Sequence, residues 1–177
     1  NSPYANAAIV VSVDHGKLFK NNLLGGLAFR KQLEEKAYNM VQNANAQSHS
    51  LPAQNMIDFL LARKTKHPLQ GSSPSGLAPT RLDQLFPESL YLHLCEAFER
   101  FQKKLDGFID EHAVLYGVES RTSCPVRILR NPTSLESTSH KGLFPCGEGA
   151  GFAGGITSAA CDGVRVADAI VRQLSSE

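Results

Sequence analysis

The stretch Cys146–Gly155, CGEGAGFAGG, decides how the chain is interpreted. Gly149, Gly151 and Gly154 have the G-x-G-x-x-G spacing of a dinucleotide-binding turn, in which glycines let a phosphate approach the backbone. The apolar segment before the turn, GLFPCGE, predicts a strand, and the segment after it, GGITSAACDGVRVADAIVRQL, predicts a helix. A helix start offers unpaired N–H groups, so this arrangement can bind an anion or an electron-rich ring.

The position of this stretch argues against the opening turn of a Rossmann domain. That turn begins a strand–helix–strand unit, and its second strand carries an acidic residue about 20 positions further on. Here one helix follows, the sequence ends at Glu177, and Asp168 lies on the helix itself. The stretch fits better as the last strand and helix of a nucleotide-binding fold. The alternative is a plain strand–helix corner that needs glycine for its own geometry.

The rest of the chain predicts helices in the middle and strands toward both ends. Strands are expected over residues 7–13, 113–119, 125–131 and 142–148, and helices over residues 25–44, 51–63, 80–86, 87–108 and 154–174. Pro52 is expected in the first turn of one helix and Thr80 as the N-cap of another. The expected buried face of the last helix consists of Ile156, Ala160, Val164, Ala167, Ile170 and Leu174. This order predicts an α+β fold with a small mixed or antiparallel sheet.

Composition and charge exclude several classes of function. The net charge of +1, from 18 basic and 17 acidic residues, gives no electrostatic basis for binding nucleic acid or an anionic membrane. No apolar run approaches the roughly 20 residues of a membrane span, and the first residues lack a secretory signal pattern. Neither the cysteines nor the histidines have metal-ligand spacing, so no metal site is expected. Four scattered cysteines predict reduced thiols and a cytoplasmic location, with two disulfides as the alternative.

The segment GLFPCGEGAGFAGGITSAACDGVRVADAI resembles the C-terminal signature of a group of bacterial FAD-dependent dehydrogenases. LAFRKQLEEKAY, PAQNMIDFL and VESRTSCPVRI resemble the middle region of the same family, so the resemblance covers nearly the whole chain. It implies FAD as the cofactor and a Gly-rich ADP-binding turn near the N-terminus of a longer polypeptide. Residues 1–141 would then form an inserted, substrate-side domain. Residues 142–177 would be the returning strand and helix of the FAD-binding domain.

The resemblance also assigns site residues. Glu148 matches the acidic residue that bonds the ribityl chain, and the helix start faces the pyrimidine end of the flavin ring. Phe152 stands where many members have Tyr. The residues expected to contact the cofactor are Gly147, Glu148, Gly149, Gly151, Phe152, Gly154, Gly155 and Ile156. Arg121 and Cys146 are candidate catalytic residues, with an ordinary salt-bridged connection and a buried structural thiol as their respective alternatives.

These observations predict a fragment of a FAD-dependent oxidoreductase whose intact parent transfers a hydride through the flavin. Alone, the fragment is expected to be inactive and to bind no FAD. Its expected partners are the missing N-terminal Rossmann part of its polypeptide and an unidentified small-molecule substrate, with NAD(P)H a candidate. The alternative is a non-enzymatic domain that binds a partner or an anion at the start of the last helix. A third interpretation is a fragment without function, whose exposed apolar surface promotes association.

Overall fold

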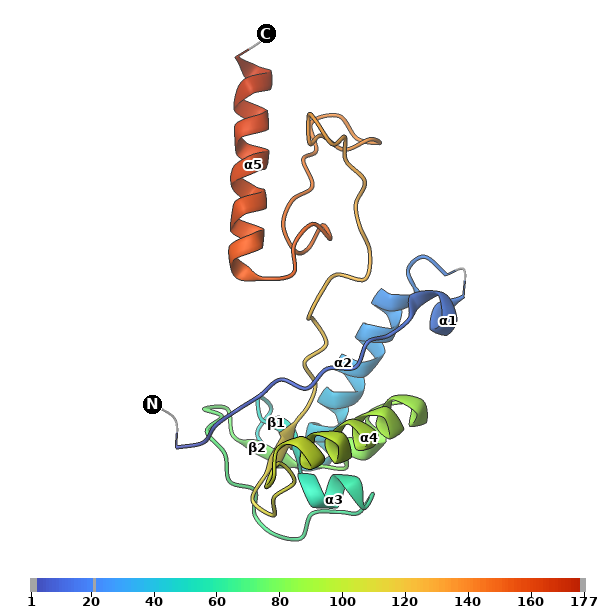
Figure 1. Ribbon diagram of the computed structural model, residues 1–177, viewed down its shortest axis with the longest axis vertical. Helices are drawn as coiled ribbons and strands as arrows, with labels where there is room; N and C mark the ends of the chain where they lie inside the picture. Colours follow the sequence, from blue (N-terminus) through green and yellow to red (C-terminus); the bar gives the residue numbers. More distant parts are fainter. Residues whose placement is uncertain (1–2, 21, 176–177) are drawn as a thin grey trace. The chain divides into compact units, whose positions relative to one another are not determined.

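The computed structural model describes residues 3–20 and 22–175 (Figure 1). Its elements are α1 (His15–Phe19), α2 (Gly25–Asn43), β1 (Leu51–Asn55), α3 (Met56–Leu60), β2 (Leu77–Pro79), the 3₁₀ helix η1 (Leu82–Gln84), α4 (Glu88–Lys104), β3 (Val114–Tyr116) and α5 (Ile156–Leu174). Helices and a small mixed sheet confirm the predicted α+β class.

The chain forms two compact units, each made of two segments. The first unit contains residues 1–13 and 31–120, and the second contains residues 14–30 and 121–177. The boundary expected between residues 141 and 142 concerns the domains of the complete protein, and it stays a prediction.

The sheet of the first unit has the strand order β2-β1-β3. The central strand β1 pairs in parallel with β2, where Leu51 lies opposite Leu77, and antiparallel with β3, where Ala53 lies opposite Tyr116. The strand predicted over residues 113–119 is therefore confirmed, because β3 lies within it. The helix predicted over residues 51–63 is wrong in its first part, since Leu51–Asn55 is a strand with a hydrogen-bonded neighbour on each side.

The helix in that region begins later, at Met56, because Asn55 caps it. The Asn55 side chain accepts hydrogen bonds from the N–H groups of Ile57 and Asp58, which satisfies two donors that the first turn leaves unpaired. The Thr80 cap is also wrong. The N–H of Thr80 donates to the Ala53 carbonyl, and η1 begins after Arg81 without a side-chain cap.

The core of the first unit gathers side chains from helices and loops far apart in the sequence. The predicted helices over residues 25–44 and 87–108 are confirmed as α2 and α4. On α4, the expected apolar stripe buries Leu94 and Phe98. The buried cluster consists of Ala37, Met56, Phe59, Leu82, Leu85, Leu94 and Phe98. All seven residues lie between positions 31 and 120, so one continuous segment supplies the core.

The strand predicted over residues 7–13 is absent; these residues are irregular. A strand needs a neighbour for its N–H and C=O groups, and this segment has none among the described residues. Its apolar character is explained by packing instead, because Ile9 and Val11 lie against the core cluster.

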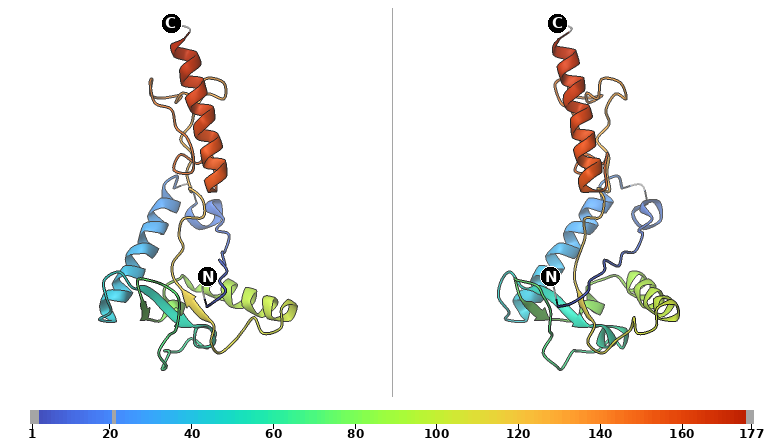
Figure 2. Two further views of the ribbon diagram at one scale, coloured as in Figure 1. Left: turned by 90° about the vertical axis from the view of Figure 1, so that its left-hand side faces the viewer. Right: turned by 60° about the vertical axis from the view of Figure 1, so that its left-hand side comes forward.

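The second unit contains α1, α5 and a long irregular segment before α5 (Figure 2). The strands predicted over residues 125–131 and 142–148 are absent, and a single bridge joins Arg130 to Ser137. The backbone around Leu143 is bonded within its own loop: its carbonyl accepts from the N–H of Ser137, and its N–H donates to His140. Without a neighbouring strand, the apolar residues of these segments form loops.

The predicted final helix is confirmed as α5, but its buried face is not the predicted one. Asp162 and Val166 are its buried residues. Ile156 is 93% exposed, Val164 62% and Leu174 67%. Ala160 and Ala167 are also exposed, and Ile170 is half-buried. An apolar stripe predicts burial only where a partner is present, and the second unit packs on the adjacent face of the helix.

Among the described residues, no helix combines the length and the apolar character that crossing a bilayer requires.

Candidate functional site

The turn Cys146–Gly155 leads into α5 and is closed by its own backbone. The N–H of Gly151 donates to the Glu148 carbonyl, and the N–H of Phe152 donates to the Gly147 carbonyl. Gly147 and Gly151 have φ values of 68° and 81°, in the region that favours glycine. A Cβ on Gly151 would also collide with the Val126 carbonyl. These two glycines are therefore required by the turn itself.

Other glycines of the turn are not required by the chain. A Cβ on Gly149 or Gly154 would meet nothing within 4 Å, and neither residue has a left-handed φ. Gly155 has an extended φ of −167°, which any residue adopts, and its Cβ would meet only the Ser158 hydroxyl at 3.9 Å. The space in front of these positions is open. A group from outside the unit can therefore approach the backbone here.

The start of α5 lies at the end of this open stretch. Gly155 is the N-cap, no side chain caps the helix, and the first turn contains no acidic residue. The first N–H groups of a helix have no partner within the helix and carry its positive dipole end. This end of α5 can therefore stabilise negative charge on a bound group.

Residues 124–130 run along the turn and hold it from outside. The Cys124 thiol donates to the Gly149 carbonyl, the N–H of Ile128 donates to the Ala150 carbonyl, and Nε of Arg127 donates to the Gly151 carbonyl at 2.9 Å. Three successive carbonyls of the turn are thus bonded to this segment, two of them to residues that sequence alone predicted to be in a strand. These hydrogen bonds hold the turn against the neighbouring segment.

Arg130 connects this segment to the turn and to α5. Its guanidinium donates to the Pro145 carbonyl at 2.7 Å and forms two parallel hydrogen bonds with the Asp162 carboxylate, at 2.9 and 2.6 Å. The same guanidinium lies 3.6 Å from the centre of the Phe152 ring, and that of Arg127 lies 5.1 Å from it. Cations over an aromatic face are attracted by its negative quadrupole.

Asp162 completes this cluster from the buried face of α5. Besides Arg130, its carboxylate accepts the N–H of Gly147 at 2.9 Å, and Arg165 approaches it at 3.9 Å. The hydrogen bonds from Arg130 outweigh the effect of burial and hold the pKa of Asp162 below its usual range. The carboxylate is therefore ionised and paired at neutral pH.

The structure places the predicted cofactor residues in the turn and at the start of α5, but with different tasks. Gly147 and Gly151 shape the turn, and the half-buried Phe152 ring supports it beneath two guanidinium groups. Gly149, Gly154, Gly155 and Ile156 border open space. Within the described part of the chain, the half-buried Glu148 carboxylate makes no hydrogen bond or ion pair. It is thus available to an outside hydroxyl group.

The candidate catalytic residues are both exposed. Cys146 is the first residue of the turn and has an exposed thiol, so the alternative of a buried structural cysteine is wrong. Arg121 is the first residue of the long segment of the second unit. Their catalytic roles stay predictions. All four cysteines are free thiols, and Cys161 is also exposed.

Sequence reasoning missed Arg130 and Asp162 as partners. No signal in the sequence pointed to the pair, because Asp162 lies outside the apolar stripe from which the buried face of α5 was predicted. The partner could not be identified, because Arg130 lies 32 positions away in a segment with no regular structure.

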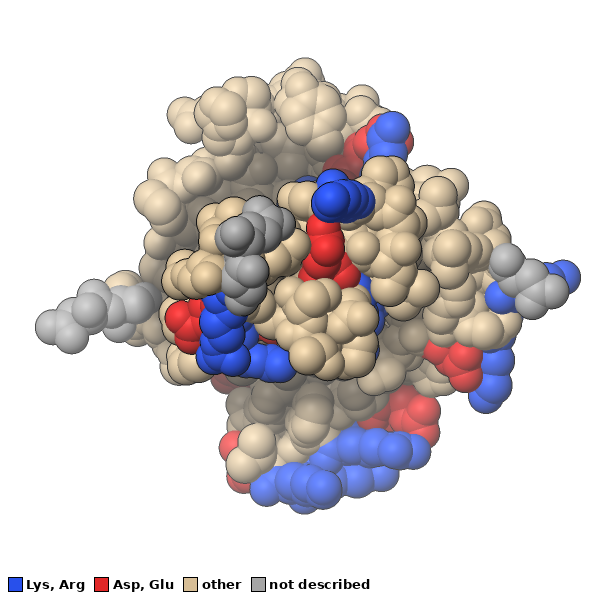
Figure 3. Space-filling view, turned by 90° about the horizontal axis from the view of Figure 1, so that it is seen from above, with Lys and Arg blue, Asp and Glu red and all other residues tan. Residues whose placement is uncertain are grey.

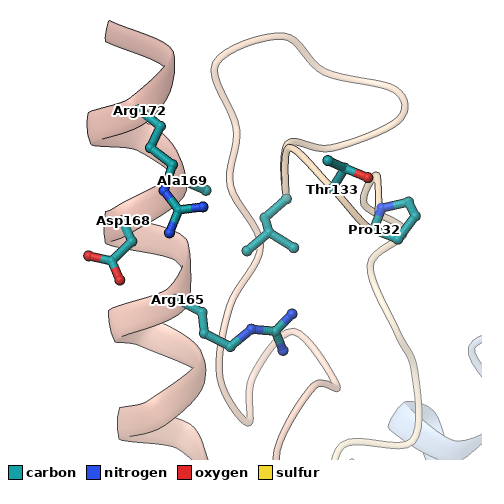
Figure 4. Close-up of a pocket in the computed structure, with 7 residues that line it drawn as sticks. Pro132, Thr133, Arg165, Asp168, Ala169 and Arg172 are labelled. Atoms are coloured by element: carbon teal, nitrogen blue, oxygen red, sulfur yellow. The ribbon is translucent and has the colours of Figure 1, made fainter. Parts of the chain in front are cut away.

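Other surface features of the described residues are separate from this turn. Acidic and basic side chains are mixed on the face drawn in Figure 3. No group of metal-ligating side chains occurs among the residues that were placed. A cavity of about 150 Å³ lies between α5 and the loop at Pro132–Leu135, with Arg165 directed toward the loop and Asp168 away from it (Figure 4). No residue of the Cys146–Gly155 turn lines this cavity.

Comparison with known proteins identifies the family of the chain. Over 172 residues the chain is 37% identical to a protein of Clostridium beijerinckii described as uncharacterised. The match covers 96% of this chain and 31% of that protein, so the chain spans about a third of the length of its relative. Residues 1–122 match the family described as FAD-dependent protein, C-terminal domain-like. With a match over more than half of its length, the chain belongs to this FAD-dependent family.

Proposed function

We propose that the chain is part of a FAD-dependent oxidoreductase in which residues 142–177 contact the flavin and residues 1–141 form the substrate-side domain. Family membership supports FAD as the cofactor of the intact protein. The observation that carries the assignment of the contact is the open side of the turn. Gly149 and Gly154 lack a side chain although nothing in the chain requires them to.

The residues of the turn fit an electron-rich ring and a polyol chain. Gly154, Gly155 and Ile156 would hold the pyrimidine end of the ring, because the uncapped start of α5 stabilises negative charge there. The unpaired Glu148 carboxylate would accept a hydrogen bond from a ribityl hydroxyl. When bound, the flavin would supply the hydride-transfer chemistry. The task of these residues is to orient the ring and to stabilise its charge.

The rest of the site would come from elsewhere in a longer polypeptide. We infer that a Gly-rich ADP-binding turn of that polypeptide is needed to hold FAD, so the 177-residue chain is inactive and binds no FAD alone. The substrate would be a small molecule, with NAD(P)H a candidate, and Arg121 and Cys146 are candidates for contacting it. The four free thiols suit a reducing compartment such as the cytoplasm.

Flavin retention tests this proposal. The 177-residue chain and a longer polypeptide of the family that carries this sequence are each mixed with FAD and passed over a gel-filtration column. We expect visible flavin absorbance to co-elute with the longer polypeptide and not with the chain. Gly154→Ala in the longer polypeptide should lower FAD retention, because its methyl group enters the open space without disturbing the chain.

Gly163→Ala is the matched control. Gly163 lies in the middle of α5, and its Cβ would also meet nothing within 4 Å, so the same change is made away from the turn. This variant should retain FAD as the unchanged protein does. A Gly154→Ala variant with unchanged retention would contradict flavin contact at the turn. A longer polypeptide that takes up no FAD would favour the alternative of an anion- or partner-binding domain.

A further inference from the structure

We propose that Arg130 and Asp162 are positioning residues that hold the Cys146–Gly155 turn in the shape in which its open glycines face the flavin. This inference rests on the proposed function, since it concerns the same turn. It assigns a role to two buried residues that do not border the open side of the turn. Their side chains are 5% and 7% exposed.

The pair reaches the turn at three separate points. Arg130 donates to the Pro145 carbonyl just before the turn, Asp162 accepts from the N–H of Gly147 at its start, and the Arg130 guanidinium lies on the Phe152 ring near its end. Asp162 also lies two helical turns into α5, the helix that follows the turn. Both sides of the turn are thereby tied to α5.

The contact with Gly147 explains why the geometry is sensitive to this pair. Gly147 has a left-handed φ of 68°, and its carbonyl accepts the N–H of Phe152. The Asp162 carboxylate fixes the N–H of the same residue. If the carboxylate moved, the residue that closes the turn would lose the bond that orients its peptide plane, and the open stretch from Gly149 to Gly154 would no longer be held.

A contribution to folding stability alone does not explain why the chain contains this buried ion pair. Removing two charges from water is costly, and apolar residues of similar volume often replace a buried ion pair without loss of stability. The planar fork of arginine, in contrast, matches a carboxylate with two parallel bonds and stacks on an aromatic face at the same time. Lysine cannot make this combination. The pair therefore has the properties needed for fixed geometry.

Two measurements test this role. The test variant and its control each remove one of the two cations that lie next to the Asp162 carboxylate. Arg130→Gln removes the buried partner of Asp162, and Arg165→Gln removes the exposed one, which lies 3.9 Å away. Hydrogen exchange in the 177-residue chain reports the N–H groups of Gly147, Gly151 and Phe152. The FAD dissociation constant of a longer polypeptide that carries the same variants reports the effect on the cofactor.

With Arg130→Gln we expect exchange of these N–H groups to rise about tenfold, the effect of losing a charge-assisted hydrogen bond, and FAD to bind about tenfold more weakly. With Arg165→Gln both should stay within about twofold, as is usual for an exposed pair. Arg130→Lys should show nearly the same increase in exchange and the same loss of FAD affinity as Arg130→Gln, because lysine lacks the planar fork. Asp162→Asn provides a second variant if Arg130→Gln fails to fold, since it keeps the shape of the side chain while removing the charge.

Three outcomes would overturn the proposal. Unchanged exchange at Gly147 in Arg130→Gln and Asp162→Asn would show that the pair does not hold the turn. Faster exchange with unchanged FAD affinity would show that the hold is unrelated to the cofactor, while the proposed function would stand. A longer polypeptide that binds no FAD even without substitutions would overturn the proposed function, and the positioning role with it.

Discussion

Single buried polar residues of the first unit have structural tasks, and Gln54 is an example. Gln54 is completely buried in the central strand, and both its amide nitrogen and its oxygen are hydrogen-bonded. Its amide donates to the Arg63 carbonyl and to the Asp83 carboxylate, both at 2.9 Å, and its oxygen accepts the N–H of Asp83. Because both N–H donors are used and the side chain is buried, Gln54 has no donor to offer a cofactor.

The same network yields a prediction for Asp83. Its carboxylate accepts from Gln54 and from two nitrogens of Arg81, whose side chain is 30% exposed. Asp83→Ala should lower the free energy of unfolding of the first unit by about 1–3 kcal/mol, because buried donors lose their acceptor and the partly exposed guanidinium regains some water. All four tyrosines lie in this unit, so tyrosine fluorescence during urea unfolding reports it selectively.

Glu35→Gln is the control for this substitution. Glu35 forms an exposed pair with Lys31 on α2, and such pairs contribute little. The unfolding curve of Glu35→Gln should overlie that of the unchanged protein. An Asp83→Ala curve that did the same would show that the network does not stabilise the unit.

The stabilisation by Asp83 should also depend on pH. Burial raises the pKa of this carboxyl, but the hydrogen bonds from Arg81 and Gln54 lower it more, so the pKa in the folded state lies below the ordinary value. A lowered pKa gives stability that is present above the unfolded value of about 4 and is lost as the pH falls through the folded value. The difference in unfolding free energy between the unchanged protein and Asp83→Ala should therefore shrink in acid. A difference that grew in acid would contradict the assigned direction.

At the scale of elements, α5 is the clearest case of a helix that lacks a partner on one face. Its buried residues Asp162 and Val166 face the loops of the second unit. Its apolar stripe, with Ile156, Val164, Val171 and Leu174, is exposed. A contiguous apolar face of this kind promotes association with another apolar surface.

Substitutions on the exposed face and on the buried face of α5 should affect different properties. Val164→Lys lies on the exposed stripe, so it should leave thermal stability within about 0.5 kcal/mol while reducing self-association and the binding of an apolar dye. Val166→Ala, at a position only 4% exposed, should destabilise α5 by about 1–3 kcal/mol and leave dye binding of the folded state unchanged. Helix melting by circular dichroism and gel filtration measure both effects. Equal destabilisation by the two variants would show that Val164 is buried in solution.

Elements were predictable from the sequence where local pattern alone decides the structure. The apolar stripe of α4 and the β-branched and aromatic residues of β3 are such patterns. Residues 125–131 and 142–148 have the composition of strands and still form loops, because a strand depends on a neighbour that sequence does not reveal. The turn Cys146–Gly155 was located by its glycines, but not the ion pair that holds it, since its partners are 32 positions apart.

At the scale of the whole molecule, the two units differ in how many buried hydrophobic residues they contain. The seven residues of the buried cluster all belong to residues 31–120. In residues 121–177, Leu135, Ala150 and Val166 are the described hydrophobic residues that are buried. The family match ends at residue 122, next to the position where the long segment of the second unit begins. The match therefore covers the whole first unit together with residues 14–30 of the second unit.

This difference predicts that the two segments behave differently when separated. A polypeptide of residues 31–120 should unfold cooperatively in urea, because it keeps the whole core cluster, all three strands, α3 and α4. A polypeptide of residues 121–177 should lose its helical signal gradually, since three buried hydrophobic residues cannot offset the conformational entropy of ordering the chain. Tyrosine fluorescence follows the first and circular dichroism the second. A steep urea transition in residues 121–177, or its absence in residues 31–120, would show that burial within the units does not determine their stability.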